Sequence, residues 1–137
     1  MCCAVSPTSE PERTPRFPAT ILCVDDSQSM LVICQTILEA SGYKVHTARN
    51  GEAALEVLGM HAIDLVIVDD RMPGMSGAEL AKEIKQFRKN LPVLMFSDSN
   101  DKPISSESVD VFMNKMSGPR ALCNAVGSLL SGFHRLG

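Results

Sequence analysis

The segment DLVIVDDRMPGMSG, residues 64–77, decides the fold predicted for this chain. Its apolar run, residues 65–68, is short and rich in β-branched residues, which is typical of a strand buried on both faces of a parallel sheet. Two aspartates follow at once, and Pro73 then breaks the chain. Ser76 with Glu79 three residues later has the pattern of a capping box, which begins a helix. The segment therefore predicts a strand, an acidic turn and a helix.

The two aspartates, Asp69 and Asp70, stand at the carboxyl end of the predicted strand. Open α/β sheets place their chemistry at this end of their strands. Aspartate also commonly does no more than begin a turn. On this segment alone both interpretations remain open, and the ends of the other strands have to decide between them.

The alternation of strand and helix extends from Thr20 through the rest of the chain. Strands are predicted at residues 21–24, 45–48, 63–68, 92–96 and 109–113. The helices carry apolar residues three and four positions apart, which gives each one a single buried stripe. Because the loops are short, this alternation predicts a doubly wound five-stranded parallel sheet with right-handed crossovers and helices on both faces.

The apolar stripes predict which side of each helix is buried. In the first helix the stripe is Met30, Ile33, Cys34, Ile37 and Leu38; in the third, Leu80, Ala81, Ile84 and Phe87; and in the last, Leu122, Ala125, Val126, Leu129 and Phe133. Asn50 is expected to cap the second helix, and Gly118-Pro119 to begin the last one. Residues 97–110, SDSNDKPISSESVD, are too polar for a full helix, so a shortened or irregular fourth helix is predicted there.

Composition limits the possible functions. Of the 137 residues, 45% are hydrophobic and 21% charged, which is ordinary for a globular domain, and the net charge is −3. The absence of a Lys/Arg cluster argues against a nucleic-acid ligand, and no apolar run is long enough to cross a membrane. The odd number of cysteines, five, without a C-x-x-C pair, indicates neither a disulfide framework nor a zinc site. We expect a cytoplasmic protein, with residues 1–19 as a flexible Pro-rich tail and residues 20–137 as one domain.

The ends of the parallel strands are predicted to bring several polar groups to one edge of the sheet. These groups are Asp25 and Asp26, Asp69 and Asp70, Ser97 and Asp98, and Asn114 and Lys115. Three carboxylates within about 5 Å repel one another by a few kcal/mol per pair at an effective dielectric constant near 20. A hard divalent cation such as Mg²⁺ would offset this repulsion. A carboxylate beside bound Mg²⁺ can act as a nucleophile and form an aspartyl phosphate, while a lysine and a hydroxyl hold the phosphoryl oxygens.

These residues resemble the receiver domain of two-component response regulators. The resemblance rests on the acidic pair after the first strand, on Asp69 four residues before Pro73, and on Ser97 and Lys115 after later strands. It covers about residues 20–131, and DDRMPGMSG is similar to the phosphoacceptor segment of that family. The resemblance implies a flavodoxin-like sheet with the strand order 2-1-3-4-5.

The resemblance also implies a role for each matching residue. Asp69 would accept a phosphoryl group from a histidine kinase or phosphotransfer protein, and Ser97 and Lys115 would bind the phosphoryl oxygens. The Mg²⁺ ligands would be Asp26 directly, Asp25 through water, Asp69 and the backbone carbonyl of Arg71. Phe112 would be the switch aromatic that turns inward with Ser97 after phosphorylation. The expected output is contact with a downstream protein, and enzymatic activity would be limited to self-phosphorylation and autodephosphorylation.

Two positions depart from the family pattern. Met116 follows Lys115 where the family usually has proline, and Asp98 follows Ser97 where it usually has a small residue. If the Asp98 carboxylate points inward, it would slow phosphorylation. Asp70 is expected to be a turn residue or a modest addition to the acidic edge.

Two other function classes are kept as alternatives. One is a receiver-fold binding module that signals without phosphate, which the departures at Asp98 and Met116 favour and the intact site residues oppose. The other is a phosphatase-type hydrolase with a strand-end aspartate and Mg²⁺. Such enzymes have a D-x-D-x-[TV] motif, which residues 69–72 do not match.

Overall fold

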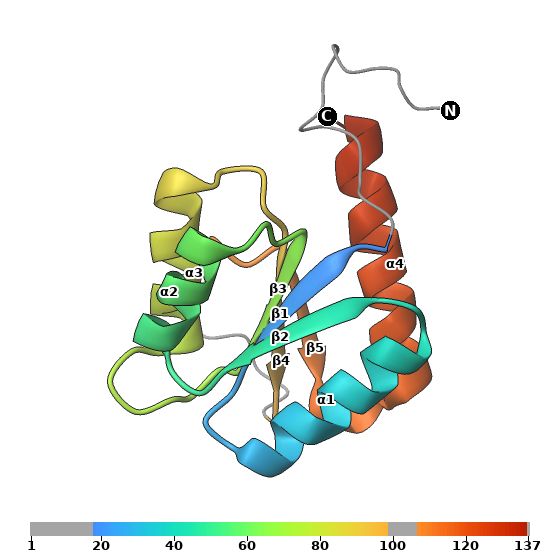
Figure 1. Cartoon of the computed structure of the whole chain (residues 1–137), viewed down its shortest axis with the longest axis horizontal. Coiled ribbons are helices and arrows are strands. Elements are labelled where there is room, and N and C mark those ends of the chain that lie inside the picture. The colour runs from blue at the N-terminus through green and yellow to red at the C-terminus, as the bar shows by residue number, and fades with distance from the viewer. Residues whose placement is uncertain (1–17, 99–106, 137) are drawn as a thin grey trace.

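Five parallel strands form the middle layer of the molecule, in the order β2-β1-β3-β4-β5 (Figure 1). The computed structural model describes residues 18–98 and 107–136, with side chains as far as residue 131. The strands are β1 (Thr20–Val24), β2 (Lys44–Ala48), β3 (Leu65–Val68), β4 (Val93–Ser97) and β5 (Val111–Asn114). The helices are α1 (Gln28–Ala40), α2 (Gly51–Met60), α3 (Gly77–Phe87) and α4 (Pro119–Leu136), with the short 3-10 helix η3 (Lys115–Ser117) after β5. The predicted fold class and strand order are confirmed.

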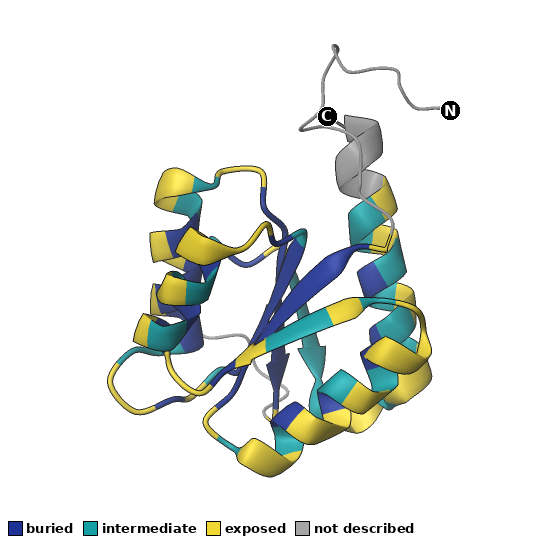
Figure 2. Cartoon of the chain, in the orientation of Figure 1, coloured by how far each residue is buried: buried dark blue, intermediate teal, exposed yellow. Residues whose placement is uncertain are grey.

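The sheet separates two hydrophobic cores. Helices α2 and α3 cover one face and α1 and α4 the other (Figure 1). Because side chains alternate between the faces of a strand, Val66 and Val68 pack toward α2 and α3, whereas Leu65 and Ile67 pack toward α1 and α4. Figure 2 shows the buried residues along the central strands, with the exposed residues on the outer sides of the helices. We call these two clusters the α2/α3 core and the α1/α4 core.

Side-chain caps determine where the first three helices begin. Ser27, Asn50 and Ser76 accept hydrogen bonds from backbone N–H groups in the first turns of α1, α2 and α3. The prediction that Asn50 caps α2 is therefore confirmed. Ser76 and Glu79 form the complete capping box expected from the sequence, which satisfies backbone donors at both positions.

Two strands begin two residues later than predicted, whereas all other predicted strand bounds differ from the structure by at most one residue. β3 begins at Leu65 rather than at residue 63, because the Asp64 carboxylate accepts a hydrogen bond from the backbone N–H of Thr20 at 2.8 Å. β5 begins at Val111 rather than at residue 109, because the Asp110 carboxylate accepts from the backbone N–H of Val93 at 2.8 Å. In both places an aspartate side chain takes a backbone donor just ahead of the strand.

The buried stripes of two helices also differ from the prediction. In α1 the buried residues are Leu31, Cys34 and Leu38, whereas Ile33 is 49% exposed. In α3 the predicted stripe is buried from Leu80 to Ile84, but Phe87, in the last turn, is 56% exposed. These two apolar side chains lie on the solvent-exposed side of their helices rather than in the core.

Two predictions concern segments that are described only in part. Between β4 and β5 the structure describes Asp98 and residues 107–110, which form turns and bends; the rest of the predicted irregular connection lies outside the described residues. Most of the predicted tail, residues 1–17, lies outside them as well. Within the described part of the chain, no helix has the length and hydropathy needed to cross a membrane.

Candidate functional site

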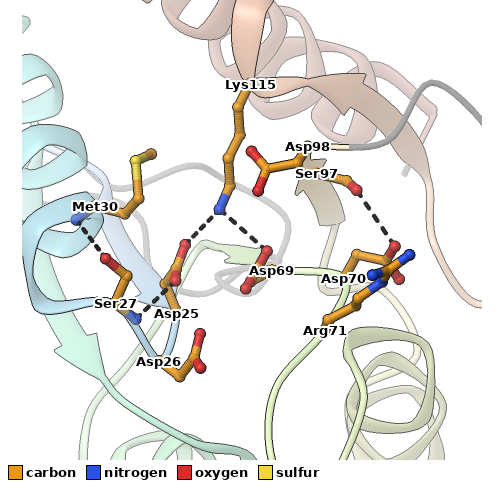
Figure 3. Close-up of a pocket in the computed structure, with 10 residues that line it drawn as sticks. All are labelled: Asp25, Asp26, Ser27, Met30, Asp69, Asp70, Arg71, Ser97, Asp98 and Lys115. Carbon is orange, nitrogen blue, oxygen red and sulfur yellow. Dashed lines mark hydrogen bonds and ion pairs between the residues drawn. The ribbon is translucent and has the colours of Figure 1, made fainter.

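The carboxyl ends of β1, β3, β4 and β5 surround one cavity of about 580 Å³. The residues that line it are Asp25, Asp26, Ser27, Met30, Asp69, Asp70, Arg71, Ser97, Asp98 and Lys115 (Figure 3). Every strand-end aspartate named from the sequence is among them, together with Ser97 and Lys115. The prediction that these side chains meet at one edge of the sheet is thus confirmed for them, whereas Asn114, also expected there, is not among the lining residues and accepts a hydrogen bond from the backbone of Met116.

Lys115 forms ion pairs with two aspartates across the cavity. Its Nζ lies 2.9 Å from Oδ2 of Asp25 and 3.1 Å from Oδ1 of Asp69 (Figure 3). All three side chains are nearly buried, with exposed fractions of 10–11%. Ion pairs removed from water in this way are screened far less by salt than exposed ones.

Strand alternation explains why these three side chains meet. Asp25 follows Cys23 by two residues, Asp69 follows Ile67 by two, and both of these neighbours belong to the α1/α4 core. Lys115 likewise follows Met113, which packs against the same core. Residues two apart on a strand share a face, so the three charged groups leave the sheet on one side.

Ser97 and Asp70 belong to the other side of the sheet. In the register of β3 with β4, Val68 lies beside Met95, so two residues further along each chain Asp70 lies level with Ser97. Val68 and Met95 both belong to the α2/α3 core. The Ser97 hydroxyl, 1% exposed as a residue, donates to Oδ2 of Asp70 at 3.3 Å (Figure 3). Sequence reasoning missed this contact, because the predicted strand ends, residues 68 and 96, differ by one residue from the observed pairing of Val68 with Met95.

Three carboxylates are arranged as a candidate cation site. Asp25, Asp26 and Asp69 each offer an oxygen within 4.8 Å of the others. Both oxygens of Asp25 already accept hydrogen bonds from the protein, one from Lys115 and one from the backbone N–H of Ser27 at 2.9 Å. A set of oxygen donors around a small cavity is what Mg²⁺ requires, so the residues fit this ion.

The electrostatics of the cavity act on Asp69 and Lys115. Burial, together with the negative charge of Asp25, raises the pKa of Asp69 from 3.8 to about 6. Burial on its own would lower the pKa of Lys115, but hydrogen bonds and charge from Asp25 and Asp69 raise it above its usual value. Lys115 therefore stays protonated, whereas the charged form of the Asp69 carboxylate is disfavoured unless a cation is bound.

Of the remaining predicted residues, two line the cavity and one does not. Arg71 and Asp98 line it from exposed positions, and Phe112 on β5 is half-buried against the α2/α3 core. Figure 3 shows the Asp98 side chain pointing toward the cavity, on the side of Lys115.

The conformation of the segment after Lys115 depends on a hydrogen bond made by the next residue, Met116. Met116 is 88% exposed, and its backbone N–H donates to Oδ1 of Asn114 at 2.6 Å, which caps η3. A proline at position 116 has no N–H and would lose this bond. Methionine at position 116, in place of the proline usual in the family, thus permits the hydrogen bond that caps η3.

The sequence model of the response regulator receiver domain matches residues 21–126, which is most of the chain. The chain belongs to this family of two-component signalling domains, in which phosphorylation and Mg²⁺ binding are typical. The fold and the predicted resemblance agree with this membership.

Known relatives include proteins much longer than the matched region. The alkaline phosphatase synthesis transcriptional regulatory protein PhoP of Bacillus subtilis is 35% identical over 80% of this chain and 48% of its own length. The sensor histidine kinase GacS of Pseudomonas protegens is 36% identical over 86% of this chain and 14% of its own length. The chain thus spans half or less of the length of these relatives.

Solved structures share the fold over most of the chain. The response regulator protein TrrA of Thermotoga maritima, crystallised with Mg²⁺ and BeF, is 33% identical with a TM-score of 0.77; the match covers 81% of this chain and 98% of that one. The chemotaxis response regulator CheY4 of Vibrio cholerae is 28% identical with a TM-score of 0.74, over 81% of this chain and 98% of that one.

Proposed function

We propose that this domain is a phosphoacceptor switch in which Asp69 takes a phosphoryl group from a histidine kinase or phosphotransfer protein. The observation that carries the proposal is the nearly buried contact of Lys115 with both Asp69 and Asp25 beside a third carboxylate. A fixed cation next to a carboxylate nucleophile can stabilise the charge that develops on a transferring phosphoryl group. The output would be a contact with a downstream protein.

The proposed step begins at the carboxylate oxygen of Asp69. This oxygen attacks the phosphorus, the bond from phosphorus to the donor's imidazole nitrogen breaks, and its electron pair remains on that nitrogen. Asp69 must be ionised to attack, and the positive charge of Lys115 favours this form. After transfer, Lys115 and Ser97 would hold the phosphoryl oxygens.

A divalent cation fits the three carboxylates of the site. Asp26 and Asp69 would bind it directly and the backbone carbonyl of Arg71 would complete the protein ligands. Asp25 would bind through water, in agreement with the protein donors that already occupy its two oxygens. When bound, Mg²⁺ supplies positive charge that offsets the repulsion among the carboxylates and stabilises the phosphoryl oxygens.

The proposed switch links the site to the outer strands. Ser97 and Phe112 would move together after phosphorylation, since β4 and β5 pair so that Phe112 lies beside Met95, two residues before Ser97 on the same face. A phosphoryl group adds nearly two negative charges to the cavity, and this charge would bias the two positions of these residues. We expect no turnover of a separate substrate beyond self-phosphorylation and autodephosphorylation.

The test is phosphorylation by acetyl phosphate, with and without Mg²⁺, followed by intact-protein mass spectrometry. The expected result is a gain of one phosphate that requires Mg²⁺ and is lost in Asp69→Asn. Asp70→Asn is the matched control, because it removes the neighbouring carboxylate and should keep the gain. A folded wild-type protein that gains no phosphate would contradict the proposal and would favour a phosphate-independent binding module.

A further inference from the structure

The hydroxyl that should bind the phosphoryl group is directed elsewhere in this structure. Ser97 is almost fully buried, and its Oγ donates to Oδ2 of Asp70 at 3.3 Å. Lys115, by contrast, lies on the opposite side of the cavity, where it contacts Asp69 and Asp25. Figure 3 shows the two groups of contacts separately, with Ser97 and Asp70 on one side and Lys115 with its aspartates on the other.

Two features fix Asp70 at this place. The parallel register of β3 and β4 brings it level with Ser97, and its backbone carbonyl accepts a hydrogen bond from the N–H of Gly77 at 3.0 Å. Gly77 in turn has no room for a side chain, because a Cβ there would clash with the carbonyl oxygen of Asp69. The turn between β3 and α3 therefore holds the Asp70 carboxylate beside Ser97.

We propose that Asp70 is a positioning residue that holds the Ser97 hydroxyl away from Asp69 until a phosphoryl group competes for it. This inference rests on the proposed function of Asp69 as phosphoacceptor. To donate to a phosphoryl oxygen, Ser97 has to give up its hydrogen bond with Asp70. A hydrogen bond to a charged acceptor is strong enough to change an affinity by about tenfold. Asp70 thus opposes the activated state and sets how readily the domain reaches it.

The experiment measures binding of beryllofluoride, a phosphoryl analogue, in the presence of Mg²⁺ to four proteins: wild type, Asp70→Ala, Ser97→Ala and the double variant. The affinity gain from Asp70→Ala should be about tenfold larger in the wild-type background than in the Ser97→Ala background. Loss of the aspartate charge acts in both backgrounds, so the ratio of the two gains isolates the competition for the hydroxyl.

Two further variants separate positioning from charge. Asp98→Ala removes another negative charge that lines the same cavity, and its effect should be equal in the two backgrounds. Asp70→Asn keeps an oxygen that can accept from Ser97 but makes the bond neutral, so its gain should fall between those of wild type and Asp70→Ala. Thermal melts of each variant are the check that it is folded.

The possible failures are distinct. Equal gains from Asp70→Ala in both backgrounds, or no gain in either, would overturn the positioning role while leaving the phosphoacceptor function in place. A folded wild-type protein that binds no beryllofluoride with Mg²⁺ and gains no phosphate on Asp69 would overturn the proposed function, and the inference about Asp70 with it.

Discussion

The carboxyl group of Asp69 is held where its negative charge is unfavourable. The residue is 9% exposed, and Asp25 and Asp26 lie beside it. Lys115 offsets part of the repulsion, but the pKa of Asp69 still lies at about 6, above the usual 3.8. The folded protein therefore binds a proton at this position more tightly than the unfolded chain does. The contribution of Asp69 to stability consequently falls as the pH rises from about 4 to about 6 and stays low above that.

Asp69→Asn should stabilise the metal-free protein at neutral pH. A pKa difference of about two units corresponds to about 2 to 3 kcal/mol in the free energy of unfolding. The advantage over wild type should grow by about 1 kcal/mol between pH 5 and pH 7.5, measured by urea denaturation in EDTA. Glu83→Gln, at an exposed position on α3, controls for the change in net charge. An advantage that is the same at both pH values would refute this account of Asp69.

Gly77 is expected to be far less tolerant of alanine than Gly59. A Cβ at Gly77 would clash with the Asp69 carbonyl oxygen and lie 3.1 Å from Cε of Met95, whereas nothing lies within 4 Å of a Cβ at Gly59 in α2. Gly77→Ala should lower the free energy of unfolding by about 1 to 3 kcal/mol. Gly59→Ala should raise it by roughly 0.5 kcal/mol, since alanine favours the helix. Equal effects in denaturant titrations would show that the turn adapts.

At the scale of elements, α1 shows why a buried stripe can be predicted only roughly. Residues 30–34, MLVIC, are all apolar, so their periodicity does not fix which side of the helix is buried. The prediction included Ile33 and omitted Leu31, whereas the structure buries Leu31 and leaves Val32 and Ile33 about half exposed. Packing against β1 and β2 decides which side of α1 faces the core. Those contacts cannot be inferred from the sequence of the helix itself. The caps at Asn50 and Ser76 were predictable because their hydrogen bonds are local.

Asp110 joins three elements and should be costly to remove. Its Oδ2 accepts from the backbone N–H of Val93 at 2.8 Å and from Nζ of Lys85 at 2.7 Å, which links the start of β4 and the last turn of α3 to the residue before β5. Asp110→Ala leaves the Val93 N–H without this acceptor, so we expect a loss of about 2 kcal/mol in the free energy of unfolding.

Lys85→Met is the comparison for this prediction, since it leaves the bond from Val93 to Asp110 but removes the ion pair, together with the hydrogen bond from Nζ of Lys85 to the Leu91 carbonyl at 2.7 Å. Its cost should be smaller, about 1 kcal/mol, because the pair is partly exposed, at 18% and 27%. Chemical denaturation monitored by circular dichroism measures both. If Lys85→Met proves as costly as Asp110→Ala, the contacts of Lys85 with Asp110 and Leu91, rather than the bond from Val93 to Asp110, are the main link between these elements.

For the whole molecule, the convergence of the strand ends followed from the alternation of strands and helices, because the carboxyl ends of parallel strands lie at one edge of the sheet. The strand order was implied only by the resemblance to receiver domains. The pairing of Lys115 with Asp25 and Asp69 is a consequence of that convergence. The bond between Ser97 and Asp70 was not predicted, since it depends on the register of β3 with β4, which spans about thirty residues of chain. Long-range register is set by the packing of both cores at once.

The sheet keeps the side chains of the two hydrophobic cores apart. Among the described residues, the α2/α3 core and the α1/α4 core are separate clusters, so the effects of substitutions in one and in the other should add independently. The rim at the carboxyl ends of the strands is where this independence ends, because one small cavity there gathers Lys115 from one side and Ser97 from the other. A group bound in that cavity would contact residues from both sides of the sheet. The effect of a substitution on one side would then depend on the residues present on the other.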